Sequence, residues 1–433
     1  MARTYPAFKF LRSGEDYSFL KNSLPGDNFW ERLKYAPLGD KNYLSIGGEI
    51  KSEFQLLRNE DWKKGNNDAA LFQRFMLHTD WHFGDKVRLF GQLKSGHALG
   101  RKGPPFYLND DALDLHQFFL GLRLWHSTLE LGRRELYYGP QRLISPREGT
   151  NVRQSFDGAR WILQETNLSL DLFFYAYNPQ RVGVFDNKIN TDQLLWGAYF
   201  VWNVPGRQGL NFDFYYLGAD NEHPRFEEGS RQERRHSFGV RHWGVKGRFK
   251  YNNEAVFQTG TFGEGNINAW TASTEMSFTL PGKSKPTPGL KAEIISGDDD
   301  PNDGDLHTFN PLFPRGGYFG LLSLIGPANL MDVHPSLGFS FGEQWSLDLD
   351  WDFFWRHKLE DGIYFPSGRL NLPGSGSKER FIGHQPGVQL GFAVNRFFEL
   401  EASYFRFFPG GFIQEVTEGE QFSQAAISFK FKF

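Results

Sequence analysis

The sequence contains no cysteine and no hydrophobic run long enough for a membrane-spanning helix. The missing cysteine excludes a disulfide scaffold and thiolate metal sites. The longest uncharged stretches, such as residues 193–206, fall short of the roughly 20 residues that a spanning helix needs. A net charge of only −3 gives no general field that would attract nucleic acid, so no nucleic-acid partner is expected.

Aromatic residues, in contrast, are abundant. Phenylalanine occurs 45 times and aromatic residues make up 17% of the chain, yet the mean hydropathy is −0.52. The rings alternate with polar residues, most clearly in WSLDLDWDFFWR (345–356), where Trp345 and Trp351 share one face and Asp348 and Asp350 share the other. This period of two predicts strands with one apolar and one wet face.

About eighteen such segments follow one another from residue 43 to the C-terminus, and their connections alternate between eight short turns and nine long loops. The pattern predicts an all-β fold: a transmembrane, antiparallel, up-and-down β-barrel of about 18 strands over residues 41–433, with short periplasmic turns and long extracellular loops. One short turn is predicted at Gly244–Val245. Residues 1–40 lack the alternation and are predicted to form a periplasmic segment or a small plug; the sequence does not choose between them.

The apolar face is predicted to point outward, into lipid. The polar face carries many charges, which could not fill a dry core unpaired, and aromatic residues gather beside the short turns, as at Trp81, Trp125 and Trp345. A soluble β-sandwich or repeat protein is the alternative, but it gives no reason for turn and loop lengths to alternate. The last strand, ending at Phe433, must then pair with the first, because an open edge in lipid leaves backbone groups unsatisfied. Lipid and lipopolysaccharide are the expected surroundings, and a monomer is expected.

Two stretches resemble the alginate-exporter family of bacterial outer-membrane β-barrels. The first contains GRREL (132–136), YGPQRL (138–143) and NVRQSFDGAR (151–160), with departures that include Arg134 for glutamine and Pro140 for aspartate; the second is ISGDDDPNDGDLHTFNPLFPRGGYFG (295–320). The resemblance implies a bacterial outer-membrane channel, and therefore a signal peptide absent from this numbering. It does not identify the cargo, because the family includes polysaccharide exporters and uncharacterised porin-like channels.

Arginines are the candidate selectivity residues. Guanidinium groups bind carboxylates bidentately, a polyuronate carries one carboxylate per sugar, and conduction needs several weak sites. In the alternative interpretation, carboxylates such as Asp157, Glu135 and Glu148 pair these arginines and hold a loop inside the barrel; both roles are compatible. The candidate substrate and selectivity residues are Arg133, Arg134, Arg142, Arg147, Arg153, Asp157 and Arg160 in the first motif, with Arg74, Arg123, Arg241 and Arg248 elsewhere on the predicted wall.

The predicted function is a channel that passes an anionic polysaccharide or oligosaccharide through a charged lumen, without any enzymatic activity, and a periplasmic export partner is compatible with it. The alternative is a general or substrate-selective diffusion porin for small hydrophilic solutes, favoured by acidic residues at 348–352 and 399–401 that would oppose the arginines. Loops 138–155 and 298–328 are expected to fold inward as a gate or constriction. The wet-face rings Phe173, Tyr175 and Tyr199 are expected to pack on such a loop rather than on sugars.

The acidic run GDDDPNDGD (297–305) is the one candidate metal site, with Asp298, Asp300 and Asp303 as ligands for a structural calcium ion. The spacing is not that of an EF-hand loop, because Asp303 stands where glycine is required. An exposed acidic loop without an ion is the alternative. No other cofactor is expected.

Overall fold

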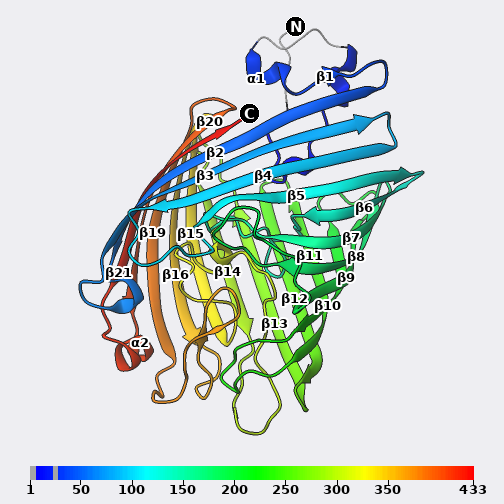
Figure 1. Ribbon diagram of the computed structural model, residues 1–433. Coiled ribbons are helices and arrows are strands. Elements are labelled where there is room, and N and C mark those ends of the chain that lie inside the picture. Colours follow the sequence, from blue (N-terminus) through cyan, green and yellow to red (C-terminus); the bar gives the residue numbers. More distant parts are fainter. Residues whose placement is uncertain (1–5, 23–27) are drawn as a thin grey trace.

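The computed structural model describes residues 6–22 and 28–433. Eighteen long antiparallel strands, β2–β16 and β19–β21, close into one barrel, and the two-residue strand β1 pairs with β2 at its edge (Figure 1). No helix in these two ranges is long and apolar enough to span a membrane. The elements are η1 (Arg12–Gly14), η2 (Ser18–Asn22), α1 (Phe29–Arg32), β1 (Ala36–Pro37), β2 (Asn42–Arg58), η3 (Glu60–Trp62), β3 (Asp68–Phe83), β4 (Val87–Leu99), β5 (Asp111–Leu124), β6 (Ser127–Arg134), β7 (Ser155–Gln164), β8 (Leu168–Asn178), β9 (Gln193–Asn203), β10 (Asn211–Asn221), β11 (Glu233–Lys246), β12 (Phe249–Phe262), β13 (Gly265–Phe278), β14 (Thr287–Ile295), η4 (Gly316–Phe319), β15 (Leu330–Phe341), β16 (Trp345–Arg356), β17 (Ile363–Tyr364), β18 (Leu370–Leu372), β19 (Phe381–Ala393), β20 (Phe398–Pro409), α2 (Gly411–Val416) and β21 (Phe422–Lys432).

The barrel closes as the sequence predicts. Strand β21 pairs antiparallel with β2, and Phe431 lies opposite Ile50. All eighteen predicted segments are strands of the barrel. One turn is misplaced: β11 and β12 pair as far as Lys246 and Phe249, so the turn falls at Gly247–Arg248 rather than at Gly244–Val245.

The two faces of the wall also match the prediction. On β8, Phe174 is 54% exposed and points outward, while its neighbours Phe173 and Tyr175 are buried on the inner side. On β21, Ile427 is 65% exposed. An apolar outer band with a polar interior is the arrangement of a barrel whose outer face contacts lipid.

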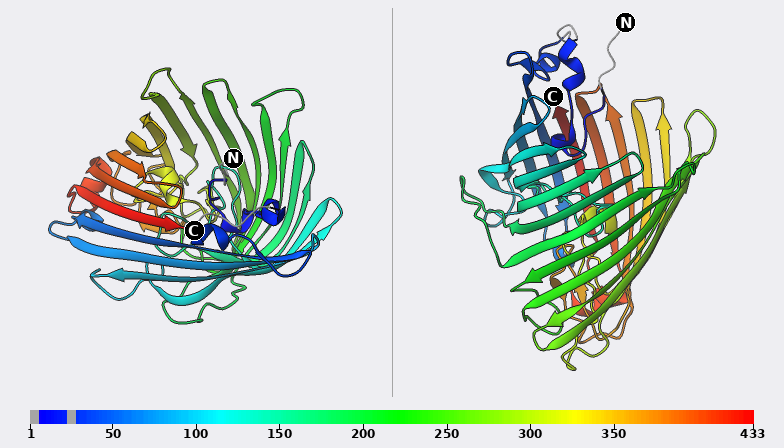
Figure 2. Two further views of the ribbon diagram at one scale, coloured as in Figure 1. Left: turned by 90° about the horizontal axis from the view of Figure 1, so that it is seen from above. Right: turned by 90° about the vertical axis from the view of Figure 1, so that its right-hand side faces the viewer.

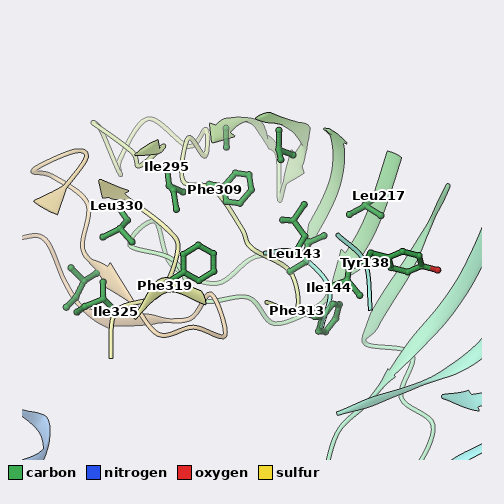
Figure 3. Close-up of a cluster of buried hydrophobic side chains, with 14 of the residues drawn as sticks. Tyr138, Leu143, Ile144, Leu217, Ile295, Phe309, Phe313, Phe319, Ile325 and Leu330 are labelled. Atoms are coloured by element: carbon green, nitrogen blue, oxygen red, sulfur yellow. The ribbon is translucent and has the colours of Figure 1, made fainter. Parts of the chain in front are cut away.

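The core of the protein lies inside the barrel, where long loops fill the lumen. Residues 135–154, between β6 and β7, are named the crossing loop here; residues 296–329, between β14 and β15, are named the acidic loop. Their backbones pair side by side: the amide of Ser145 donates to the carbonyl of Phe313 (2.9 Å), and the amide of Phe313 donates to that of Leu143 (2.8 Å). Figure 3 shows Ile144 and Phe313 together within the buried apolar cluster that joins these loops to the wall.

Residues 6–22 and 28–40 lie at the barrel end that carries the short turns, where the C-terminus is also found (Figure 2). Arg12 donates to the carbonyls of Gly48 (2.9 Å) and Phe433 (2.7 Å), at the seam of the barrel. The ring of Phe10 lies 5.6 Å from the ring of Tyr137 in the crossing loop. The N-terminal segment therefore contacts both the seam and the loop that fills the lumen.

Candidate functional site: the loop-filled lumen

The crossing loop spans the lumen from wall to wall. Tyr138 donates to Asp171 on β8 (3.0 Å), and its ring stacks on Phe173 and Tyr199. At the other end of the loop, the side-chain amide of Asn151 donates to the backbone carbonyls of Gln73 on β3, His97 on β4 and Asn109. The inward-pointing rings thus pack against an infolded loop, as the sequence analysis favoured.

Arg142 fixes the middle of the crossing loop to the far wall. Its guanidinium is buried and donates to Glu254 on β12 (2.8 Å), to Glu293 on β14 (2.9 Å) and to Thr271 on β13 (3.0 Å). An arginine whose donors are directed at two protein carboxylates and a threonine hydroxyl is a tether rather than a free anion site.

Most of the other predicted arginines are likewise paired with protein carboxylates. Arg133 pairs with Asp157 at 2.7 Å, so the predicted role of Asp157 as a partner corresponds to the geometry. The pair of Arg133 with Asp157 joins two strands of the wall, whereas that of Arg74 with Glu148 joins the wall to the crossing loop, which is the alternative raised from the sequence. The remaining pairs are Arg74 with Glu49 and Glu148, Arg134 with Glu130, Arg153 with Glu135 and Glu148, Arg160 with Glu130 and Asp171, and Arg241 with Asp213.

Arg248 and Arg123 lie away from this network. Arg248 is exposed in the β11–β12 turn, so its predicted place on the lumen wall is wrong, because the hairpin extends beyond the point where the sequence alternation breaks. Arg123 is exposed near the short-turn end of β5, on the same face as the buried Phe119. Neither has a carboxylate partner in the described part of the chain.

Three unpaired arginines meet on the long-loop side of the crossing loop. A cavity of about 610 Å³ follows the wall at β2, and a second of about 420 Å³ lies against β9–β11. Both are lined by Arg147, Arg225 and Arg369, together with Tyr107 and Ser367. Among residues 6–22 and 28–433, no ion pair or side-chain hydrogen bond joins these guanidiniums to a carboxylate. We name Arg147, Arg225 and Arg369 the arginine triad.

Only Arg147 of the triad was a candidate from the sequence. Arg225 and Arg369 lie in the loops 222–232 and 357–380, where no periodic pattern indicates which way a side chain points. The backbone of the first loop joins the second, because the amide of Leu370 donates to the carbonyl of Arg225 (2.9 Å). Pairing of two distant loops leaves no local signal in a sequence.

The predicted acidic wall is present at the short-turn end of β16 and β20. Asp348 and Glu401 are solvent-exposed there, and Glu399 is half-buried and pairs with Lys432 at 3.1 Å. The arginine triad therefore lies in the cavities on the long-loop side, and the exposed Asp348 and Glu401 lie at the opposite mouth.

In the N-terminal segment, the ammonium group of Lys34 is expected to make docking of the segment to the barrel depend on pH. Lys34 is buried; its ammonium lies over the rings of Phe8 and Tyr17 and donates to the carbonyl of Ile46 (3.2 Å). Burial, and the nearby positive charge of Arg12, lower its pKa from 10.5 to about 7.

We expect docking of this segment to strengthen as the pH rises from about 7 towards 10.5. In that window the free lysine holds a proton that the docked lysine does not, so docking gains up to about tenfold per pH unit. Proteinase K cleavage within residues 6–40 should slow accordingly in wild type and become independent of pH in Lys34→Met. Lys21→Met, which removes an exposed charge from the same segment, should keep the wild-type profile. A flat wild-type profile would contradict the assignment.

The chain is similar to known proteins both in sequence and in fold. A family model described as "Alginate export" matches residues 42–424. Among solved structures, Pseudomonas aeruginosa OccK2 (OpdF) in complex with glucuronate is 12% identical, with a TM-score of 0.60 over 90% of this chain and 96% of that chain. P. aeruginosa OpdK with vanillate is 11% identical, with a TM-score of 0.60 over 90% and 98%. A BenF-like porin from P. fluorescens Pf-5 is 10% identical, with a TM-score of 0.61 over 90% and 98%. At such identities the likeness concerns the fold alone. No curated protein matches the chain.

Proposed function

The chain belongs to the alginate-export family of outer-membrane β-barrel channels, and from this premise we propose that it selects short carboxylated saccharides, of the uronate class, at the arginine triad. The observation that carries the proposal is the meeting of three arginines without carboxylate partners in two adjoining cavities. Guanidinium is the side-chain group best matched to a planar carboxylate. For Arg74, Arg133, Arg142 and Arg160 that chemistry is already satisfied by aspartate and glutamate.

The size of the cavities favours short solutes. Volumes of about 420 and 610 Å³ fall within the range typical of small-molecule sites. A polymer needs an uninterrupted path, whereas the crossing loop is bonded to opposite walls. Two of the structurally similar channels are described with glucuronate and with vanillate, and both compounds carry one carboxylate.

Polysaccharide passage is the second candidate function. It is favoured by the family match, and it requires that the crossing loop leave the lumen. The consequence of freeing that loop is argued in the Discussion.

The test is single-channel recording in planar bilayers with glucuronate as titrant. We expect glucuronate to interrupt the wild-type current, and each of Arg147→Gln, Arg225→Gln and Arg369→Gln to weaken the interaction by about tenfold, since each removes one charged hydrogen-bonding partner. The triple variant should also lose preference for anions. Arg248→Gln removes the same charge from an exposed turn at the other end of the barrel and should change neither property.

Two outcomes would count against this proposal. If glucose interrupts the current as effectively as glucuronate, the channel is a general porin. If a polyuronate acts at far lower concentration per carboxylate than glucuronate, and the wild-type channel lets it through, polymer passage is the better description.

A further inference from the structure

We propose that Asp298, Asp299 and His307, with the carboxylate of Glu228 beside Asp298, form a divalent-cation site, best suited to calcium, where three long loops meet outside the lumen constriction. Glu228 comes from the loop 222–232, and the two aspartates come from the acidic loop. Asp361, from the loop 357–380, orients Asp298. This site differs from the set Asp298, Asp300 and Asp303 that the sequence predicts.

The first observation is a buried carboxylate without a partner. Glu228 is 8% exposed, and neither of its carboxylate oxygens has a hydrogen-bond partner. No lysine or arginine of the described residues pairs with it. Its neighbours are instead the carboxylates of Asp298 and Asp361. A buried carboxylate next to two others requires a compensating positive charge or a proton.

The second observation is a separate convergence of ligand atoms on Asp298. Oxygen atoms of Asp298 and Asp299 and a ring nitrogen of His307 lie within 4.8 Å of one another. The buried Nδ1 of His307 has no hydrogen-bond partner and lies 3.4 Å from Oδ2 of Asp298. Glu228 lies beside Asp298, one member of this group, and Asp299 of the same group also pairs with the ammonium of Lys358 at 2.9 Å.

The surrounding hydrogen bonds hold these ligands in place. The amide of His307 donates to Oδ2 of Asp298 (2.7 Å), and the amide of Asp298 donates to Oδ2 of Asp361 (3.1 Å). Asp361 also accepts from Thr308 and Tyr364, and through the amide of Asp298 it supports the position of that residue. Such a second layer of contacts is what fixes the geometry of metal ligands.

Asp300 and Asp303 have a different role. Each is exposed and accepts from a backbone amide two residues further on, at Asn302 (3.1 Å) and Asp305 (2.9 Å). These two hydrogen bonds shape the turns of the acidic loop, and neither of them involves Glu228. This makes Asp303 a matched control for the ligands.

Calcium is the best-suited ion because the donors are mainly carboxylate oxygens on flexible loops. An ion here would join loop 222–232 to the acidic loop, three residues from Arg225. If the triad acts as proposed above, the ion also holds Arg225 in register with Arg369; this last step alone rests on the proposed function.

The test uses the full-length barrel refolded in detergent without lipopolysaccharide, so that no lipid-borne cation contributes. Calorimetric titration with calcium chloride should give one site with a dissociation constant on the order of 0.1–1 mM, as for extracellular calcium sites. Terbium bound at the site should be sensitised by Tyr364, whose hydroxyl donates to Asp361. Calcium should also slow proteinase K cleavage in the loop 222–232.

Glu228→Gln keeps the shape of the side chain and should weaken binding at least tenfold, while Asp303→Asn should bind as wild type does. Because Glu228→Gln removes repulsion between carboxylates, it should remain folded, and its ion-free loops should resist protease at least as well as wild type. Absence of calcium binding in wild type up to 10 mM, or undiminished binding in Glu228→Gln, would overturn the proposal; a shared proton would then explain the buried carboxylates. Binding of zinc without calcium would overturn the choice of ion. None of these measurements involves solute current, so the result stands apart from that of the glucuronate titration.

Discussion

Replacing Arg142 by methionine is expected to raise single-channel conductance at least about twofold, because the substitution releases the middle of the crossing loop from the far wall. Arg142 is the buried residue that joins this loop to β12, β13 and β14. Methionine fills a similar volume but donates nothing. Glu254 and Glu293 would then be left buried without their cation.

The energetic basis is the asymmetry of buried ion pairs. Removing one partner of such a pair costs about 3–5 kcal/mol, chiefly because the remaining charge is stranded. Water must reach Glu254 and Glu293 to relieve this cost, and it reaches them only if the loop moves away from the wall. The loss should therefore appear as a wider path and more frequent open-state fluctuation rather than as unfolding of the barrel, whose strands remain fully paired.

A rescue separates this mechanism from a general loss of charge. Glu254→Gln and Glu293→Gln, introduced together with Arg142→Met, remove the stranded charges and should return conductance towards the wild-type level. Arg123→Met removes a lumen-side arginine that has no carboxylate partner and should leave conductance nearly unchanged. If Arg142→Met alone conducts as wild type does, the crossing loop is held by its other contacts and the tether is not decisive. If Arg142→Met lets a polyuronate pass where wild type does not, the second candidate function gains its main support.

The barrel could be predicted from the sequence because its constraints are local. An outward residue such as Phe174 must meet lipid and its neighbours must not, so a period of two persists along every strand. The same reasoning misplaced the turn that falls at Gly247–Arg248, because β11 and β12 stay paired as far as Lys246 and Phe249.

The site could be predicted only in part, because its charges are assigned by contacts between distant segments. Arg142 and Arg147 lie five residues apart in one motif, yet Arg142 pairs with Glu254 and Glu293 while Arg147 has no such partner. Which arginine is satisfied depends on where the crossing loop meets the wall, 112 and 151 residues away in sequence. The same holds for Glu228, whose role depends on Asp298 in another loop.

Replacing Arg12 by alanine is expected to release the N-terminal segment from the barrel mouth. Arg12 is buried, donates to Gly48 and Phe433 at the seam, and pairs with Glu15 at 2.8 Å. Alanine removes all three bonds and strands the buried Glu15, which costs several kcal/mol by the reasoning applied to Arg142. Proteinase K should then cleave within residues 6–22 much faster than in wild type. Lys41→Ala, a change of an exposed charge at the same rim, should have no such effect.

The conductance of the double variant Arg12→Ala/Arg142→Met shows whether the N-terminal segment and the crossing loop restrict the current independently or as one unit. The N-terminal segment contacts the crossing loop through only a few groups, with the ring of Phe10 beside Tyr137 and under Arg153, whereas the crossing loop has its own bonds to β3, β8 and β12. We therefore expect the N-terminal segment and the crossing loop to act as two electrical resistances in series along the conduction path. Opening either one leaves the other limiting, so the double variant should gain more conductance than the product of the two single gains. If the double variant conducts no better than the larger single variant, segment and loop move as one plug, and the contacts at Phe10 are what join them.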